Sequence, residues 1–205
     1  VYNSEMILLD RVDYKQQSRD KSFGRKHDGS EEFYHFDTPT PKTPNIGGVA
    51  LLPDSVTPLF SEQSGFYKDK LSLALTNKYG GSIYYTTNGA EPDTTSGIKY
   101  TEEIAIDSTC IIRARIIKKN TVPGKIGTQT YFINESSTLP VVSLTADPKD
   151  LWDKSKGIYH KYKKRGWERP GNVEYFDLNK EGVHFSAFKN EISMRIAGKT
   201  SRRQP

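Results

Sequence analysis

The sequence predicts a mainly β protein with an antiparallel β-sandwich in its middle. Apolar and polar side chains alternate with a period of two through residues 58–133, which is the pattern of half-buried strands. Gly, Pro and Asn pairs interrupt these runs at short intervals, as turns between the strands of a sandwich do. We expect a partial β-sandwich before this region and a truncated α+β unit after it.

The composition excludes several other protein classes. With 16 glycines and 11 prolines, the chain has too little of either for a collagen-like or low-complexity protein. Its longest apolar runs, at residues 7–9 and 47–52, are too short for a transmembrane helix. The single cysteine, Cys110, cannot form an intrachain disulfide bond. The formal net charge of +5 comes from residues 135–205, so only this third of the chain favours an anionic partner.

In the N-terminal part, alternation at residues 12–14 and 33–36 predicts two short strands on either side of a turn-rich stretch at residues 20–30. Three prolines then fall within TPTPKTPN, residues 38–45. Proline fixes φ and removes a backbone donor, so this stretch is expected to be an extended linker rather than a helix or a central strand. A domain boundary is therefore expected there.

The middle region is long enough for about seven short strands. Turn signals such as Gly80-Gly81 and Asn88-Gly89 separate them. The sets of residues expected to alternate with their neighbours along the strands are Leu71, Leu73 and Leu75; Ile83, Tyr85 and Thr87; and Ile112, Ala114 and Ile116.

After residue 134 the pattern changes from strands alone to strands with a short helix. Asp147 can cap a helix and Pro148 suits its first turn, which predicts a helix over residues 148–154. Alternation predicts strands at residues 140–145, with Val142 and Leu144 on one face, and at residues 173–177, 183–188 and 192–196.

Two resemblances cover the first two thirds of the chain. Residues 12–45 resemble the C-terminal half of a bacterial lamin tail domain, an immunoglobulin-like sandwich, through a Ser-x-Gly-Arg turn that begins at Ser22, an aromatic strand and a closing Thr-Pro segment. The stretches PLFSEQSGFYKDKLSLALTN (residues 58–77) and IYYTTNGAEPD (residues 83–93) resemble the chitobiase/β-hexosaminidase C-terminal-type domain. The second resemblance implies an immunoglobulin- or fibronectin-like sandwich that is accessory to another domain and carries no catalytic residue.

A third resemblance, to the opening of the CotH (spore coat protein H) kinase-like family, rests on LPVVSLTADPKDLWDKSKGIYHKY (residues 139–162), WERPGNVEYFD (residues 167–177) and MRIAGKTSRRQP (residues 194–205). It implies a longer bacterial parent protein that is secreted and uses ATP with a divalent metal. Because the family's lysine-containing motif would begin after Pro205, we expect no catalytic residue and no cofactor in this chain.

Together these resemblances predict four segments. They are the C-terminal part of a lamin-tail-like sandwich at residues 1–45, a linker at 46–57, a chitobiase-type sandwich at 58–134 and the truncated start of a CotH kinase-like domain at 135–205. We expect the chain to be a piece of a bacterial protein that is extracellular or attached to the cell surface.

The basic C-terminal residues are the candidates for binding a phosphate. Phosphoryl transfer needs cations at the phosphate oxygens, acidic metal ligands and a base, and this chain supplies only the cations. A solvated basic loop is the alternative interpretation. The candidate nucleotide- or phosphate-binding residues are Arg195, Gly198, Lys199, Arg202 and Arg203.

Tyr84 and Tyr85 are the candidates for stacking on sugar rings. As neighbours on a strand they point to opposite faces, one of them into the core, so packing is the alternative role. Asp93 and the two threonines after it could offer oxygen ligands to calcium, although no repeated acidic loop supports such a site. The four histidines show no metal-ligand spacing, and no metal site is predicted.

Residues 161–169, KYKKRGWER, mix cations with aromatic side chains, a composition also found in grooves that bind nucleic acid. A mobile loop whose lysines lie along apolar surface is the favoured interpretation, and no nucleic-acid partner is expected.

The sequence therefore favours a non-catalytic accessory, spacer and interaction region that presents a downstream CotH-type domain. The expected partners are proteins at the cell surface, with glycans as a further class, and no enzymatic activity is expected of this chain as it stands. The alternatives are the nucleotide-binding entry segment of an ATP-dependent secreted protein kinase and a carbohydrate-binding module.

Overall fold

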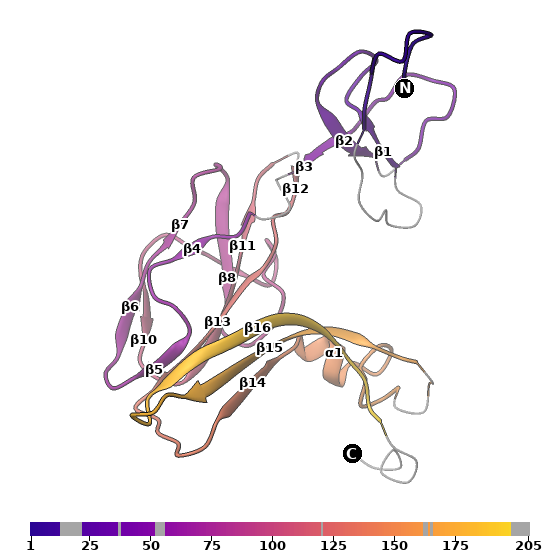
Figure 1. Cartoon of the computed structure of the whole chain (residues 1–205). Coiled ribbons are helices and arrows are strands. Elements are labelled where there is room, and N and C mark those ends of the chain that lie inside the picture. Colours follow the sequence, from indigo (N-terminus) through magenta and orange to yellow (C-terminus); the bar gives the residue numbers. More distant parts are fainter. Residues whose placement is uncertain are drawn as a thin grey trace. The chain divides into compact units, whose positions relative to one another are not determined.

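The computed structural model describes residues 1–12, 22–36, 38–51, 56–119, 121–161, 164 and 166–197. These residues fold mainly as β-strands (Figure 1). The chain divides into two compact units. One contains Val1–Asp54 and Lys119–Val122, and the other contains Ser55–Lys118 and Pro123–Pro205.

The first unit is built on one four-stranded sheet. Its strands, in spatial order, are β1 (Ser22–Arg25), β2 (Phe33–Phe36), β3 (Val49–Leu51) and β12 (Thr121–Val122). β1, β2 and β3 pair antiparallel, and β12 pairs parallel to β3. Phe36 is buried, and its ring lies so close to Gly48 that a Cβ atom there would stand 2.5 Å from a ring carbon.

The structure of this unit differs from the sequence predictions at three places. Ser22–Arg25 forms a strand inside the stretch expected to be rich in turns, because its partner Phe33–Phe36 supplies the ladder hydrogen bonds. Val12 lies outside any strand, and Tyr14 falls outside the described residues. Part of the predicted linker, Val49–Leu51, forms β3; the four predicted segment boundaries stay predictions.

The second unit contains the predicted β-sandwich. One layer is a five-stranded sheet with the order β5 (Gly65–Tyr67), β13 (Gly127–Ile133), β11 (Cys110–Ile117), β8 (Ser82–Thr86) and β9 (Ile98–Lys99). The other layer comprises β10 (Ile104–Ile106) paired with β6 (Leu71–Leu73), and β4 (Leu59–Phe60) paired with β7 (Leu75–Thr76). All of these pairs are antiparallel except β5 with β13, which is parallel.

Most of the side chains that alternate in the predicted strands lie in the core of the sandwich, but Thr87 is exposed and its neighbour Thr86 is buried, because β8 ends at Thr86. Leu73 from one layer and Ile112, Ala114 and Ile116 from the other are fully buried. Tyr131 is also fully buried, and its hydroxyl donates a hydrogen bond to the Glu62 carbonyl at 2.9 Å. The hydroxyl is thereby satisfied inside an apolar core. The prediction of a mainly β chain with an antiparallel sandwich is confirmed.

A third sheet follows the sandwich in the chain and belongs to the same unit (Figure 1). Its strands are β14 (Val141–Thr145), β15 (Arg169–Leu178) and β16 (His184–Met194), all antiparallel. The strands predicted at residues 183–188 and 192–196 are therefore one continuous strand up to Met194.

The helix α1 (Pro148–Trp152) lies between β14 and β15 and begins where the sequence predicted. Asp147 caps it: one carboxylate oxygen accepts from the Lys149 N–H at 2.8 Å, and the other accepts from the Glu91 N–H in the sandwich at 2.9 Å. The helix ends two residues earlier than predicted. Asp153 is already extended there, and its carboxylate accepts from the Ser155 N–H at 2.7 Å.

The first strand of the third sheet, β14, packs its polar face and not its apolar face against the sandwich. On β14, Val142 and Leu144 share a face as predicted, but they are 61% and 59% exposed. Ser143 and Thr145 are the buried residues of this strand, and the Ser143 hydroxyl lies 2.7 Å from that of Thr130 on β13. The interface is therefore built in part from hydrogen bonds between strands of different sheets.

An aromatic cluster fills the apolar part of the same interface. Phe176 on β15 is fully buried. Its ring meets those of Phe132 and Phe66 edge to face, with centroids 5.3 and 5.8 Å away. Such T-shaped contacts stabilise aromatic pairs beyond the area that they bury.

Among the described residues, no helix is long and apolar enough to cross a membrane.

Candidate functional site

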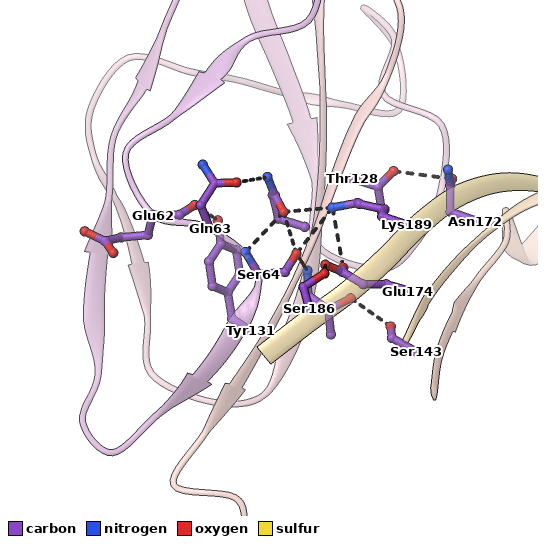
Figure 2. Close-up of polar contacts among 12 residues, drawn as sticks. Glu62, Gln63, Ser64, Thr128, Tyr131, Ser143, Asn172, Glu174, Ser186 and Lys189 are labelled. Atoms are coloured by element: carbon purple, nitrogen blue, oxygen red, sulfur yellow. Dashed lines mark hydrogen bonds and ion pairs between the residues drawn. The ribbon is translucent and has the colours of Figure 1, made fainter. Parts of the chain in front are cut away.

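A network of polar side chains connects β16 to the edge of the sandwich, and we call it the polar seam (Figure 2). It consists of Ser64, Gln129, Glu174, Ser186 and Lys189. The Lys189 ammonium donates to Gln129 Oε1 at 2.8 Å and to Ser64 Oγ at 3.3 Å, and it lies 3.4 Å from Glu174 Oε2. Ser186 donates to the other Glu174 oxygen at 2.7 Å.

The ion pair of the polar seam is only partly open to water. The Glu174 side chain is 6% exposed and that of Lys189 is 31% exposed. Burial lowers the pKa of Lys189, and the neighbouring Glu174 carboxylate opposes this effect. Each charge therefore depends on the other, as expected for a pair withdrawn from solvent.

A second polar feature is a cleft of 460 Å³ between β11 and the strands β15 and β16. We call it the basic groove. The charged side chains that line it are Glu91, Arg113, Arg115, Lys125 and Glu191.

Arg113 and Arg115 place two positive charges in the wall of the basic groove. Arg113 is 6% exposed, and its Nη1 donates to the Gly89 carbonyl at 2.7 Å. The Nε–H groups of both arginines are buried and have no hydrogen-bond partner within the described part of the chain. Burial lowers the pKa of Arg113, an effect opposed first by Glu91. A buried N–H without an acceptor costs about 1–3 kcal/mol.

The basic groove continues into a neighbouring groove of 390 Å³, and Ile126, Asn172 and Glu191 line both. Side-chain hydroxyl and amide groups are frequent in this continuation, where Leu59 and Phe60 provide an apolar wall. The Thr128 hydroxyl donates to Asn172 Oδ1 at 3.4 Å across it.

The sandwich is the part of the chain that comparison with known families identifies. Residues 62–128 match the chitobiase/beta-hexosaminidase C-terminal domain. The match runs from just before β5 into the start of β13 and includes both groove arginines. It covers about a third of the chain, so the family assignment applies to the chitobiase-type domain alone. No curated protein matches the chain, and the resemblances of the flanking segments stay predictions.

The two candidate sugar-stacking tyrosines of the chitobiase-type domain lie on opposite faces of β8. Tyr84 pairs with Arg115 on β11, so these two side chains share the face that carries the basic groove. Tyr85 pairs with Ala114 and shares the core face. Both tyrosines are half-buried. Tyr84 is therefore the one that shares a face with Arg115, and it lies outside the set of residues that line the basic groove.

Of the candidate phosphate-binding residues, the structure describes Arg195 alone. Gly198, Lys199, Arg202 and Arg203 are outside the described residues. Arg195 is exposed, and its guanidinium lies 3.4 Å from Glu168 Oε1, so an acidic side chain already accompanies its charge. Nothing in the described residues therefore favours Arg195 over the groove arginines as an anion ligand.

Trp167, in the basic stretch that follows α1, has its ring covered by cations. Lys164 Nζ lies 3.8 Å from the ring centroid and the Arg169 guanidinium carbon 4.0 Å from it. The indole N–H donates to the Lys156 carbonyl at 2.9 Å. The ring is thus engaged in contacts within its own segment, and the expectation that no nucleic acid binds there stays a prediction.

Asp93, the candidate calcium ligand, closes a turn before β9. Its Oδ1 accepts from the Thr95 N–H at 2.6 Å, from the Thr95 hydroxyl at 2.7 Å and from the Ser96 N–H at 2.6 Å. These bonds lower the pKa of Asp93, with the Thr95 hydroxyl as the largest cause. Among the described residues, no group of three or more His, Cys, Asp or Glu could hold a metal ion.

Acid is expected to remove the contribution of Asp93 to stability. A carboxylate whose pKa is lower in the folded state stabilises the fold above its unfolded pKa, about 3.9, and loses this effect as the pH falls toward the folded value. Asp93→Asn should therefore lower the melting temperature at pH 7 and have a smaller effect at about pH 2. Differential scanning fluorimetry across this range measures the difference, with the exposed Asp69→Asn as control. An effect of Asp93→Asn that stays constant with pH would contradict this assignment.

Cys110 is half-buried, and burial raises the pKa of its thiol. A protonated thiol is a poor nucleophile, which favours the predicted packing role.

Sequence reasoning missed Arg113 and Arg115 as candidate site residues. They alternate with the core residues Ile112, Ala114 and Ile116, so the period of two assigns them to a solvent face. One signal could have shown otherwise. Ile111 and Ile117 lie on the same face of β11 as the two arginines, so both faces of this strand carry apolar residues. A strand with apolar residues on both faces is usually covered on both sides.

Proposed function

We propose that the unit Ser55–Lys118 with Pro123–Pro205 is a non-catalytic accessory region, in which the chitobiase-type sandwich holds the segment after residue 134 in a fixed arrangement. The contact between the sandwich and the third sheet is the observation that carries this proposal. Phe176 is fully buried there, and the polar seam ties β16 to the sandwich through Lys189.

The family match supports the proposal, because the matched family is named as the C-terminal domain of chitobiase and β-hexosaminidase, an accessory position. In our proposal the protein acts outside the cell or at its surface, where the sandwich presents a CotH-type domain and contacts other proteins or glycans. A nucleotide-binding entry segment is the second candidate. The segregated positive charge of residues 135–205 motivates it.

Unfolding of the full chain tests whether the sandwich and the following segment act as one body. The chain has two tryptophans, Trp152 and Trp167, both after residue 134, so tryptophan fluorescence reports that segment. Amide exchange at Ile112 and Ile116 reports the core of the sandwich. We expect both probes to give the same free energy of unfolding, because the buried interface couples the two parts. A segment that loses its fluorescence signal at distinctly lower denaturant would contradict the proposal.

The absence of catalysis is tested by a coupled assay with ATP and Mg²⁺ on the same protein. We expect background turnover, and heat-inactivated protein serves as control. Robust metal-dependent turnover would overturn the accessory role, and calorimetric binding of Mg-ATP without turnover would favour the nucleotide-binding candidate instead.

A further inference from the structure

The basic groove contains donor groups that fit an anion. Arg113 and Arg115 reach it from the same face of β11, and each has a buried Nε–H without a partner within the described residues. A guanidinium presents its N–H groups as a planar fork that matches the oxygens of a carboxylate or phosphate. An oxyanion in the groove would accept from the guanidinium groups that line it, and its charge would offset the cost of burying Arg113.

The charges around the groove select an anion with a single negative charge. Three cations, Arg113, Arg115 and Lys125, face two carboxylates, Glu91 and Glu191. One carboxylate group brings this set to neutrality. A phosphate monoester carries close to two negative charges at neutral pH and would leave an excess of negative charge in a partly buried cleft.

The surroundings of the two arginines favour a saccharide as the carrier of that carboxylate. Tyr84 is the cross-strand neighbour of Arg115 on the same face of the sheet, and a tyrosine ring offers a flat amphipathic surface. The continuing groove is lined by groups that both donate and accept hydrogen bonds, as sugar hydroxyls require. These residues are Thr57, Gln63, Thr128, Gln129, Asn172 and Asn190.

We propose that the basic groove binds the carboxylate of an acidic saccharide through Arg113 and Arg115. The neighbouring sugar units extend along the continuing groove, where the hydroxyl and amide side chains meet their hydroxyl groups. This inference goes beyond the proposed accessory role, because the groove can bind such a ligand whether or not a CotH-type domain accompanies it.

The test uses the full chain and a tetramer of galacturonate as the probe. Arginine Nε–H groups give resolved signals in nitrogen–proton correlation spectra, so the two groove arginines can be followed directly. We expect the Arg113 and Arg115 Nε–H signals to shift on titration, and we expect binding to weaken as salt is raised because the contact is ionic. The tetramer with its carboxyl groups reduced to alcohols should bind at least about tenfold more weakly.

Matched variants identify the groove as the site. Arg115→Gln and Lys125→Gln each remove one cation that lines the groove, and each should raise Kd about tenfold. Lys70→Gln removes one positive charge from an exposed position in the loop between β5 and β6 and should leave Kd unchanged. Melting temperatures of all three variants show whether the fold is retained, and Lys125, which is exposed in a loop, keeps the test valid if Arg115→Gln destabilises the sandwich.

Three results would overturn the inference: no shift of either arginine signal at millimolar probe, equal affinity for the carboxyl-reduced tetramer, or tighter binding of tetraglutamate than of the galacturonate tetramer. The last would assign the groove to acidic peptides. None of these results affects the accessory role, which fails only through independent unfolding of the two parts or through turnover.

Discussion

Replacing Phe176 with alanine is expected to lower the free energy of unfolding by about 3–5 kcal/mol. The ring is fully buried between the sandwich and the third sheet, and its removal takes away both the transferred apolar surface and the edge-to-face contacts with Phe66 and Phe132. The cavity that remains lies between two sheets held by their own hydrogen bonds, so it can close only in part. Chemical denaturation followed by circular dichroism measures the loss.

Phe185→Ala on β16 is the matched control for this substitution. Phe185 is 48% exposed, and we expect its replacement to change stability by less than about 1 kcal/mol. Equal losses for the two variants would mean that Phe176 does not hold the third sheet on the sandwich. If Phe176→Ala lowers the stability reported by tryptophan fluorescence but leaves amide exchange at Ile112 unchanged, then only the segment after residue 134 depends on the Phe176 ring.

Lys189→Met is expected to destabilise the chain by about 2–4 kcal/mol, because it leaves the Glu174 carboxylate buried without its cation. The lowered pKa of Lys189 shows that burial already disfavours its charge. The double variant Lys189→Met/Glu174→Gln removes both charges and keeps an acceptor for Ser186. It should therefore be close to the wild type in stability.

Denaturation of the two single variants and the double variant gives the coupling energy of the ion pair. A double variant as unstable as the sum of the single variants would contradict the dependence of each charge on the other. The exposed Lys149→Met, outside the polar seam, controls for the loss of a lysine from this unit.

Local patterns predicted the strands and their faces well where one face is apolar and the other polar. Ile112, Ala114 and Ile116 alternate and are buried together, and Asp147 caps α1 as its type and position indicate. These features depend on residues within one strand or one turn. A period of two or a capping residue therefore carries enough information to predict them.

Sequence alternation did not predict which side chains are buried where a second sheet covers the other face of a strand. On β14 the apolar residues Val142 and Leu144 face outward, while the polar Ser143 and Thr145 are buried against the sandwich. The Ser143 hydroxyl lies 2.7 Å from that of Thr130 on the sandwich, and no local pattern indicates that these two hydroxyls meet. Arg113 lies on the face of β11 that meets β15 and β16, so the basic groove could not be predicted from the sequence of β11 alone.

The Asp147 carboxylate links the helix α1 to the loop before β9. One oxygen of its carboxylate holds the first turn of α1 and the other holds the backbone of Glu91, which precedes the turn closed by Asp93. A displacement of the helix therefore pulls on the loop before β9 through a single side chain. Tension applied along the chain after residue 145 would reach the chitobiase-type domain by this route as well as through the sheet interface.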